Sequence, residues 1–265
     1  MDLLENKEIN DEVARHPWEL GRFEIIKKNV HRIHSNMSKN SKRVLVDIGC
    51  GDAYVLRRLY GFFDFDRVVG VDVNFTDDNR ASLLNVNSRI EYLTHISQLN
   101  LESTDQVMIL LNDVIEHVEE HIEFLEELKS KLDRVEHCSV FITVPAYQFL
   151  FSQHDIDLGH YRRYKVSDLE AYSQQLKMQS QSSGYFFFSL FLIRAIQKWV
   201  SGSMKINKVE NSKNKDSIGV AEWNGSVLLT RILTWFLRLD YGFLKLMSSL
   251  GVQLPGLSAY IVYSK

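Results

Sequence analysis

Short apolar runs alternate with stretches of helical periodicity in the first two thirds of the chain. The runs cover residues 43–48, 67–73, 90–93, 106–111 and 139–144. Continuous apolar runs of this length are typical of strands that are buried on both faces of a parallel sheet. The sequence between and around them predicts helices at 10–36, 54–60, 114–132 and 166–176. This alternation predicts an α/β fold with a doubly wound, mostly parallel sheet and helices on both faces.

The pattern changes after a sixth predicted strand at 177–183. Residues 185–200 and 226–250 are apolar and helical in character, and a polar stretch at 202–222 separates them. Strand character returns near the C-terminus, and we expect that segment to rejoin the sheet. The predicted organisation is an N-terminal helical lid, a core, a helical insertion and a last strand, at residues 1–40, 41–183, 184–256 and 257–265.

Composition excludes some classes of protein. The 265 residues are 45% hydrophobic and 25% charged, which is typical of a globular protein. A net charge of −3 argues against a nucleic-acid partner. Residues 185–265 nevertheless carry ten basic and four acidic side chains. Because this basic segment is also apolar, residues 185–250 are predicted to contact a membrane surface or to form a homodimer or self-packed hairpin.

Features that direct a protein out of the cytoplasm are not expected. Cys50 and Cys138 are too few for a disulfide framework, and neither belongs to a CxxC pair. The acidic N-terminus has no apolar signal-peptide core, and no uninterrupted apolar run reaches the roughly 18–20 residues of a membrane-spanning helix. We therefore expect a cytoplasmic protein whose insertion could lie on the inner face of the membrane.

The strongest chemical signal is VLVDIGCGDA followed by VVGVDV. Gly49 and Gly51 fall in the turn after the first strand, where glycine lets the backbone approach a ligand closely. Asp47 precedes this turn, and Asp72 ends the second strand, where an acid can bind ribose hydroxyls. These residues predict a site for a nucleotide-type cofactor at the carboxyl edge of the sheet.

The details of the turn favour one cofactor. A dinucleotide site has the pattern G-x-G-x-x-G, but Tyr54 stands at the third glycine position. Asp52 opens the following helix and would repel a pyrophosphate. Acids around the turn suit a cofactor that carries a sulfonium and an amino acid instead. We therefore predict S-adenosyl-L-methionine (SAM).

The order VDIGCGDA, VDV and LLNDVIEHV resembles class I SAM-dependent methyltransferases, which have a Rossmann-like fold. The resemblance implies that Gly49 and Gly51 lie under the cofactor, that Asp47 faces its methionine part and that Asp72 binds its ribose. It also implies that two further residues face the cofactor or the acceptor, namely Asn112 as a cofactor ligand and Asp113 as a catalytic residue. Near the third strand Thr94 or His95 stands where the family often has an acid beside the adenine.

A second cluster, VPAYQFLFSQHDIDLGHYRRY, follows the fifth strand and is predicted to bind the acceptor. A histidine with a pKa near neutrality can accept a hydroxyl proton, so His154 or His160 is the candidate base. Asp155 or Asp157 could orient that base. Further candidate acceptor ligands are Asp155, Arg162, Arg163 and Tyr164, the arginines through a phosphate. The alternative is that His160 and the arginines bind the protein's own acids and lock the loop.

The pattern H-D-x-x-x-G-H-x-R-R-Y resembles a bacterial branch of these methyltransferases, often associated with assembly of cell-envelope glycans or lipid-linked sugars. HPWELGR and QLPGLSAYIVYSK resemble that branch near the two ends of the chain. The resemblance implies that a methyl group is transferred to a small or lipid-linked acceptor. The methylated group would be a hydroxyl of a glycan or a related envelope precursor. The alternatives are a catalytically degenerate scaffold at a membrane glycan complex and, less favoured, a nicotinamide-dependent oxidoreductase.

A metal site is not predicted. HVEEH at 117–121 satisfies the inverted zinc-protease pattern H-x-x-E-H. Its place after the fourth strand is the wrong context, and the many neighbouring acids indicate a solvated helix face. His117 could instead approach the active site. His154, Asp155 and His160 supply metal-ligand types but lack a diagnostic spacing.

Overall fold

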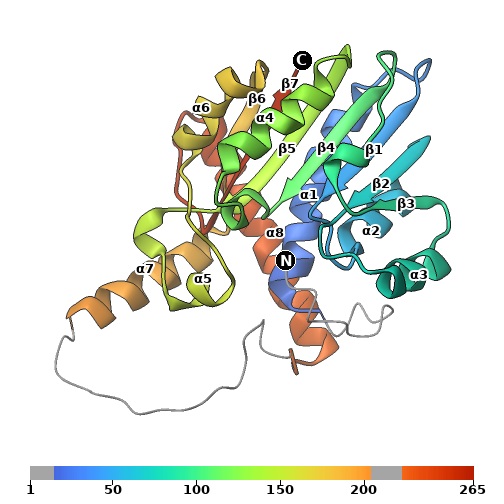
Figure 1. The fold of residues 1–265 in the computed structure, drawn as a ribbon. Helices are drawn as coiled ribbons and strands as arrows, with labels where there is room; N and C mark the ends of the chain where they lie inside the picture. The colour runs from blue at the N-terminus through green and yellow to red at the C-terminus, as the bar shows by residue number, and fades with distance from the viewer. Residues whose placement is uncertain (1–14, 204–222) are drawn as a thin grey trace.

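The structure is a computed structural model that describes residues 15–203 and 223–265 (Figure 1). In this part of the chain, seven strands form one sheet in the order β3-β2-β1-β4-β5-β7-β6. The strands are β1 (Arg43–Ile48), β2 (Arg67–Val71), β3 (Ile90–Leu93), β4 (Gln106–Asn112), β5 (His137–Pro145), β6 (Gln179–Phe186) and β7 (Ser258–Ser264). The first five are parallel, whereas β7 runs antiparallel to both β5 and β6. The predicted α/β fold and the return of the C-terminal strand to the sheet are confirmed.

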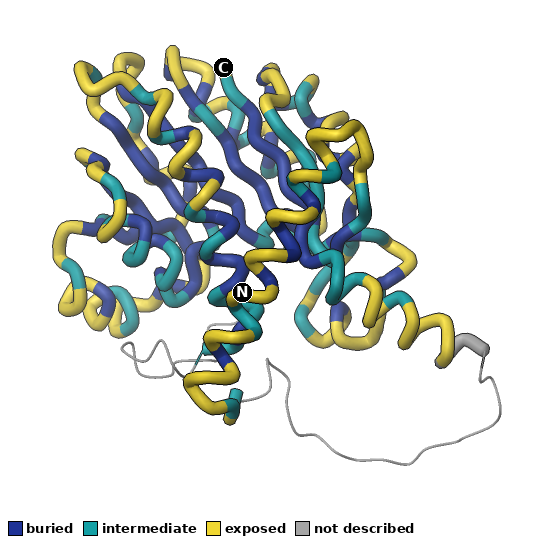
Figure 2. Tube along the Cα trace, turned by 180° about the vertical axis from the view of Figure 1, so that it is seen from behind, coloured by how far each residue is buried: buried dark blue, intermediate teal, exposed yellow. Residues whose placement is uncertain are grey.

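Helices cover both faces of this sheet (Figure 1). The helices of the described residues are α1 (Pro17–Ser35), α2 (Tyr54–Phe62), α3 (Asp77–Val86), α4 (His121–Leu132), α5 (Gln153–Asp157), α6 (Val166–Leu176), α7 (Phe188–Ser203) and α8 (Val227–Ser249). Apolar side chains of α4 and α6 belong to the core on one face of the sheet, and those of α1, α2 and α8 belong to the core on the other face. The central strands β1 and β4 are buried along their whole length, as their continuous apolar sequence predicts (Figure 2).

Helix α1 belongs to the core as well as to the predicted lid. The His16 side chain accepts a hydrogen bond from the Trp18 backbone and caps the helix, and Pro17 occupies its first turn. Farther along, Asn29 contacts the hydroxyl of Tyr241 on α8 at 3.2 Å. Residues 10–14, where the predicted helix begins, lie outside the described residues.

The helix predicted at 114–132 is shorter than expected. The structure has a 3-10 turn, η2 (Ile115–His117), followed by α4 from His121. The chain does not run as one helix here because Val118 adopts an extended backbone conformation between η2 and α4, with φ −99° and ψ 116°, and Glu116 is buried. His117 and His121 therefore do not share a helix face, which removes the geometry that the zinc pattern requires.

Two smaller expectations also change. Ser167 is the capping residue that the sequence suggests for the helix predicted at 166–176, but Lys165 caps α6, and its backbone N–H donates to the Asp168 carboxylate at 2.7 Å. The sixth strand is displaced from its predicted position at 177–183 to Gln179–Phe186, so it crosses the predicted boundary of the insertion at 184. Pairing with β7 explains the extension, since Phe186 lies opposite Ser258.

The insertion contains the two expected helices, and a buried carboxylate joins them. Asp240 on α8 accepts backbone hydrogen bonds from Phe188 at 2.8 Å and Ser189 at 2.9 Å, at the start of α7. A negative charge is favourable at a helix N-terminus. Among the described residues, no helix is long and apolar enough to cross a membrane. The polar stretch predicted at 202–222 lies almost entirely outside the described residues.

We expect Asp240→Ala to lower the free energy of unfolding by about 1–3 kcal/mol, because two helix N–H groups lose a charged acceptor. Urea denaturation of the full chain measures this. Asp133→Ala is the control, since Asp133 forms an exposed pair with Lys129 at 2.8 Å and should contribute about 1 kcal/mol or less. A loss for Asp240→Ala no larger than that of the control would contradict the role of Asp240.

Candidate active site

The glycine turn after β1 is held close to its neighbours. Gly49 has φ +70° and Gly51 has φ +54°, both in the region that favours glycine. The Gly49 N–H donates to the carbonyl of Val71 at 2.7 Å. A Cβ atom on Gly49 would lie 2.7 Å from a methyl group of Val114, so the position has no room for a side chain. Glycine is required here by both the backbone conformation and the packing.

Asp72, at the end of β2, fixes this turn. Its buried carboxylate accepts hydrogen bonds from the Gly51 backbone at 2.8 Å and from the Asn74 backbone at 2.9 Å. These bonds join the turn after β1 to the loop after β2. Asp72 therefore positions the backbone on which a ligand would rest, in addition to facing the cleft.

Asp47 and Asn112 lie together beneath the turn. The Asn112 amide is 3.4 Å from the Asp47 carboxylate, and both side chains are buried. Burial raises the pKa of Asp47 to about 7. The carbonyl oxygen of Asn112 has no hydrogen-bond partner among the described residues. This pair of acceptors suits a cationic donor such as an ammonium group, because such a donor would satisfy both.

Arg22 of α1 belongs to the site, although it was not among the predicted site residues. Its guanidinium forms an ion pair with Asp113 and donates to the Thr143 hydroxyl at 2.9 Å. Asp113 thus connects the end of β4 to β5 and to the N-terminal helix. The only sequence signal was the HPWELGR segment, which the family resemblance had already singled out.

A cleft of about 660 Å³ joins these groups to the predicted acceptor loop. The cofactor end of its lining includes Gly49 and Asp72, and Trp18 and Arg22 of α1 form another wall. Asp113, His117, His154 and His160 also line it, and so does His95 near β3. The volume is in the range of small-molecule and cofactor sites. One cleft therefore contains Gly49, Asp72 and the three predicted catalytic residues. Asp47 and Asn112 line a smaller pocket that shares Gly49, Trp18 and Arg22 with this cleft.

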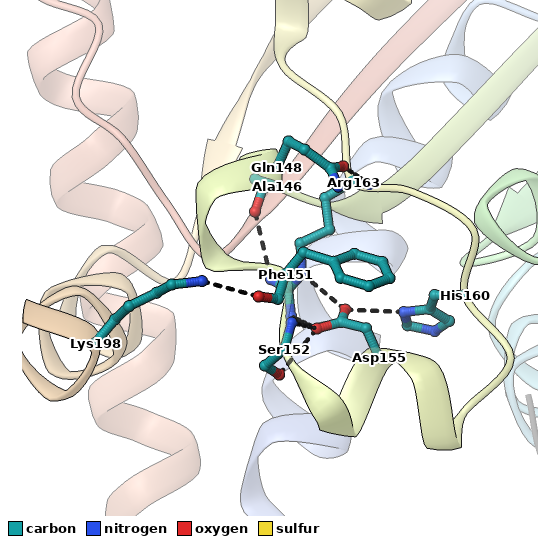
Figure 3. A network of polar contacts seen from close by, with 8 residues as sticks. All are labelled: Ala146, Gln148, Phe151, Ser152, Asp155, His160, Arg163 and Lys198. Carbon is teal, nitrogen blue, oxygen red and sulfur yellow. Dashed lines mark hydrogen bonds and ion pairs between the residues drawn. The ribbon is translucent and has the colours of Figure 1, made fainter. Parts of the chain in front are cut away.

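The acceptor loop is organised around Asp155, whose side chain is 0% exposed (Figure 3). Its carboxylate accepts hydrogen bonds from the Ser152 backbone at 2.9 Å, His160 Nδ1 at 3.1 Å and Arg163 Nε at 2.7 Å. Burial raises the pKa of Asp155, but these partners outweigh it and hold the pKa below its ordinary value. Asp155, and not Asp157, is therefore the partner of a cleft histidine.

The three predicted acceptor ligands Arg162, Arg163 and Tyr164 all make hydrogen bonds within the protein. Arg163 binds Asp155 and the Ala146 carbonyl, and Arg162 binds His121 and the Glu119 carbonyl. Tyr164 is buried and donates to the Ile115 carbonyl at 3.1 Å. None of these three side chains lines the cleft, so the geometry supports the alternative in which the arginines lock the loop. The two arginines bind groups of the protein itself.

His117 lines the cleft, in keeping with the expectation that it could approach the active site, and Glu116 lies beside it although it was not a predicted site residue. Glu116 is fully buried behind the cleft, and the His117 ring packs at 82° to the His160 ring with centroids 4.5 Å apart. Burial, as the first cause, lowers the pKa of His117 to about 4. The signal was present in DVIEHV, but a solvated helix face was expected there.

Comparison with known proteins places this geometry in a family. A family model described as a methyltransferase domain matches residues 18–200. The chain belongs to this methyltransferase family. It is a class I SAM-dependent methyltransferase with SAM as its cofactor, as the sequence predicted, which removes the oxidoreductase alternative. The sequence of this chain matches no curated protein.

Solved structures show the same fold at low sequence identity. A proposed sarcosine dimethylglycine methyltransferase from Galdieria sulphuraria has a TM-score of 0.55 and 9% identity, with 99% of this chain and 95% of that chain covered. Phosphoethanolamine N-methyltransferase 2 from Haemonchus contortus, in complex with SAM, has a TM-score of 0.53 and 12% identity, with 91% and 52% covered. The plantazolicin methyltransferase BamL has a TM-score of 0.51 and 12% identity, with 93% and 85% covered.

The residues at the carboxyl edge of the methyltransferase sheet fit SAM. The unpartnered carbonyl of Asn112 and the buried carboxylate of Asp47 would hold its ammonium group. Gly49 and Gly51 would support the cofactor from below, and Asp72 would hold its ribose hydroxyls. Among the two candidates for the adenine end, His95 lines the cleft and Thr94 does not.

We expect Asp72→Ala to weaken SAM binding by about 10- to 100-fold, because the variant loses the carboxylate that would hold the ribose and that fixes Gly51. Calorimetric titration with SAM and S-adenosylhomocysteine measures the affinity. Asp77→Ala, at an exposed position at the start of α3, is the control and should bind as the wild type does. Unchanged affinity in a folded Asp72→Ala protein would refute the assignment.

Proposed function

We propose that this methyltransferase methylates a hydroxyl group of a small or lipid-linked glycan acceptor. The observation that carries the proposal is the single cleft that joins Gly49 and Asp72 to the imidazoles of His154 and His160. The same cleft is also lined by the indole of Trp18 and by the polar side chains of Asn74 and Asp113. An aromatic ring beside hydrogen-bonding groups suits a sugar, which has apolar faces and hydroxyl edges.

Methyl transfer to oxygen requires alignment of the acceptor and removal of its proton. Bound SAM supplies a methyl group on a sulfonium, which is a good leaving group. The acceptor oxygen forms the new bond to the methyl carbon, the carbon–sulfur bond breaks with its electron pair on sulfur, and the hydroxyl proton must be accepted. His154 suits this role because it lines the cleft and its ring has no hydrogen-bond partner among the described residues. His160 has only its Nε2 left for such a role, because Asp155 already holds its Nδ1.

We expect His154→Gln to lower kcat by about 10²- to 10⁴-fold while the affinity for SAM stays unchanged, as loss of a general base requires. Release of S-adenosylhomocysteine with a panel of free and polyprenyl-diphosphate-linked sugars identifies the acceptor and measures turnover. His137→Gln, at an exposed position at the opposite end of β5, is the matched control.

Two results would contradict this assignment. Full turnover by His154→Gln would remove His154 as the base. SAM binding by the wild type without turnover on any hydroxyl acceptor would contradict the proposed reaction and favour the scaffold alternative.

We also propose that α7 and α8 bring the acceptor loop to a membrane surface. Both helices expose large apolar side chains, among which Trp199 is 74% and Ile196 59% exposed on α7, and Leu228 is 68% and Trp235 59% exposed on α8. Arg194 and Lys198 on α7 and Arg231 and Arg238 on α8 add positive charge. Apolar and aromatic side chains interspersed with Lys and Arg suit the interface of an anionic bilayer.

Contacts between α7 and the acceptor loop support this placement. Lys198 donates to the Phe151 carbonyl at 2.8 Å, next to the loop residues around Asp155 (Figure 3). The Phe191 ring lies 6.2 Å from the Phe149 ring, in the preceding 3-10 turn η3 (Gln148–Leu150). A surface that held α7 would therefore hold the loop that faces the acceptor.

We expect Ile196→Glu/Trp199→Glu to weaken binding to vesicles that contain phosphatidylglycerol by at least about 10-fold, since each buried side chain contributes roughly 1.5–3 kcal/mol. Vesicle sedimentation measures binding, and Val86→Glu is the control at an exposed apolar position on α3. The surface would instead belong to a homodimer if the wild-type protein does not bind vesicles and sediments as a dimer, and if the double variant sediments as a monomer.

A further inference from the structure

Glu116 is a buried carboxylate without a partner. Its side chain is 0% exposed, and neither carboxylate oxygen has a hydrogen-bond partner among the described residues. Burying a polar group without a hydrogen bond is unfavourable, and native proteins almost always supply a partner. Burial raises the pKa of Glu116 well above its ordinary value, and the neighbouring Asp113 adds to the shift. The group is therefore suited to gain a cationic partner from outside the chain.

Two imidazoles converge on this carboxylate. One oxygen of Glu116, one ring nitrogen of His117 and one ring nitrogen of His160 all lie within 4.8 Å of one another. The site is formed from two segments that are already joined, because the Tyr161 backbone donates to the Glu116 carbonyl at 2.8 Å. Tyr164, through its bond to the Ile115 carbonyl, fixes the same junction.

Each histidine has a second partner that orients its ring. His160 Nδ1 is 3.1 Å from the Asp155 carboxylate, which leaves its Nε2 available. The His117 ring is hydrogen-bonded to the backbone of Leu158, which leaves its other nitrogen available. Metal-binding histidines typically use one nitrogen for the metal and donate the other N–H to a carboxylate or a backbone carbonyl. Arg163 completes the arrangement because it holds Asp155 in place.

We propose that Glu116, His117 and His160 bind a divalent ion of the first transition series, such as Mn²⁺, Fe²⁺, Co²⁺ or Zn²⁺, at the wall of the cleft. Two imidazoles and one carboxylate suit these ions, whereas Mg²⁺ and Ca²⁺ prefer oxygen ligands alone. His117 and His160 line the cleft and Glu116 lies behind them. The coordination positions that these three residues leave open therefore face the cleft. This site departs from the expectation, drawn from the sequence, that the protein has no metal site.

The ion would act on the acceptor, and this part of the inference rests on the proposed function. A hydroxyl oxygen bound to a divalent cation loses its proton more readily, because the cation stabilises the resulting alkoxide. The oxygen would occupy an open coordination position, and its proton would pass to His154. His160 is then a metal ligand and His154 the base, which separates the roles of the two predicted catalytic histidines.

The test is the binding of MnCl₂ and of ZnCl₂ to the full chain after treatment with EDTA and dialysis. We expect one ion per chain, measured by electron paramagnetic resonance of free Mn²⁺ and by calorimetry for Zn²⁺. Glu116→Gln keeps the shape of the side chain and should weaken binding by about 100-fold or more. Glu119→Gln changes an exposed acid three residues away and should bind as the wild type does.

Each outcome decides the proposal. Electron spin-echo spectroscopy of bound Mn²⁺ should detect imidazole nitrogen, with a weaker signal in His117→Gln, while thermal unfolding confirms that each variant is folded. Folded wild-type protein that binds neither ion, or Glu116→Gln that binds with unchanged affinity, would overturn the site.

Activity separates this site from the proposed reaction. Turnover on a hydroxyl acceptor that is undiminished in the metal-free protein would overturn the role of the ion, while the proposed function would stand. Metal binding that requires Glu116, without turnover on any hydroxyl acceptor, would instead leave the site and overturn the proposed function.

Discussion

The parallel pairing of β1 with β2 and β4 is the constraint on which the site depends. Asp47 lies opposite Gly70 on one side and Leu110 on the other. Two residues later, Asp72 and Asn112 therefore emerge on either side of Gly49. A shift of one residue in this register would turn every side chain of a strand to the other face of the sheet. Burial of the apolar side chains on both faces fixes the register, and hydrophobic packing thereby sets the geometry of the cofactor end.

The acceptor end is set by a different interaction, the buried ion pair of Asp155 with Arg163. Loops rarely bury charge, because an unpaired ion in the interior is very unfavourable. Here two nitrogen atoms of Arg163 bind the carboxylate at 2.7 and 3.1 Å, and the Ser152 backbone adds a further donor. The pair keeps the loop in one conformation and turns His160 toward the cleft.

The fold and the identity of the cofactor were predicted correctly from the sequence because both depend on local patterns. A fully apolar run followed by a glycine turn, as at Gly49, is enough to predict a buried strand and the turn after it. The acceptor end depends on contacts between distant segments, which no local pattern contains. The sequence suggested Arg163 as a ligand for phosphate because only the folded structure shows that the buried Asp155 is its partner. Glu116 was expected on a solvated helix face because the extended backbone at Val118, which separates η2 from α4, leaves no periodic signal.

Asp155 and Glu116 are two buried carboxylates on either side of the His160 ring, and the protein treats them in opposite ways. Asp155 has donors for both oxygens, and its pKa is held low. Glu116 has no donor, and its pKa is raised. Among the described residues, Glu116 alone has both carboxylate oxygens buried and unpartnered. An unsatisfied buried carboxylate beside a ligand cleft indicates a local cost of function rather than poor packing. A cation between Glu116 and His160 would remove that cost and would extend the hydrogen-bonded chain from Arg163 through Asp155 to the reacting oxygen.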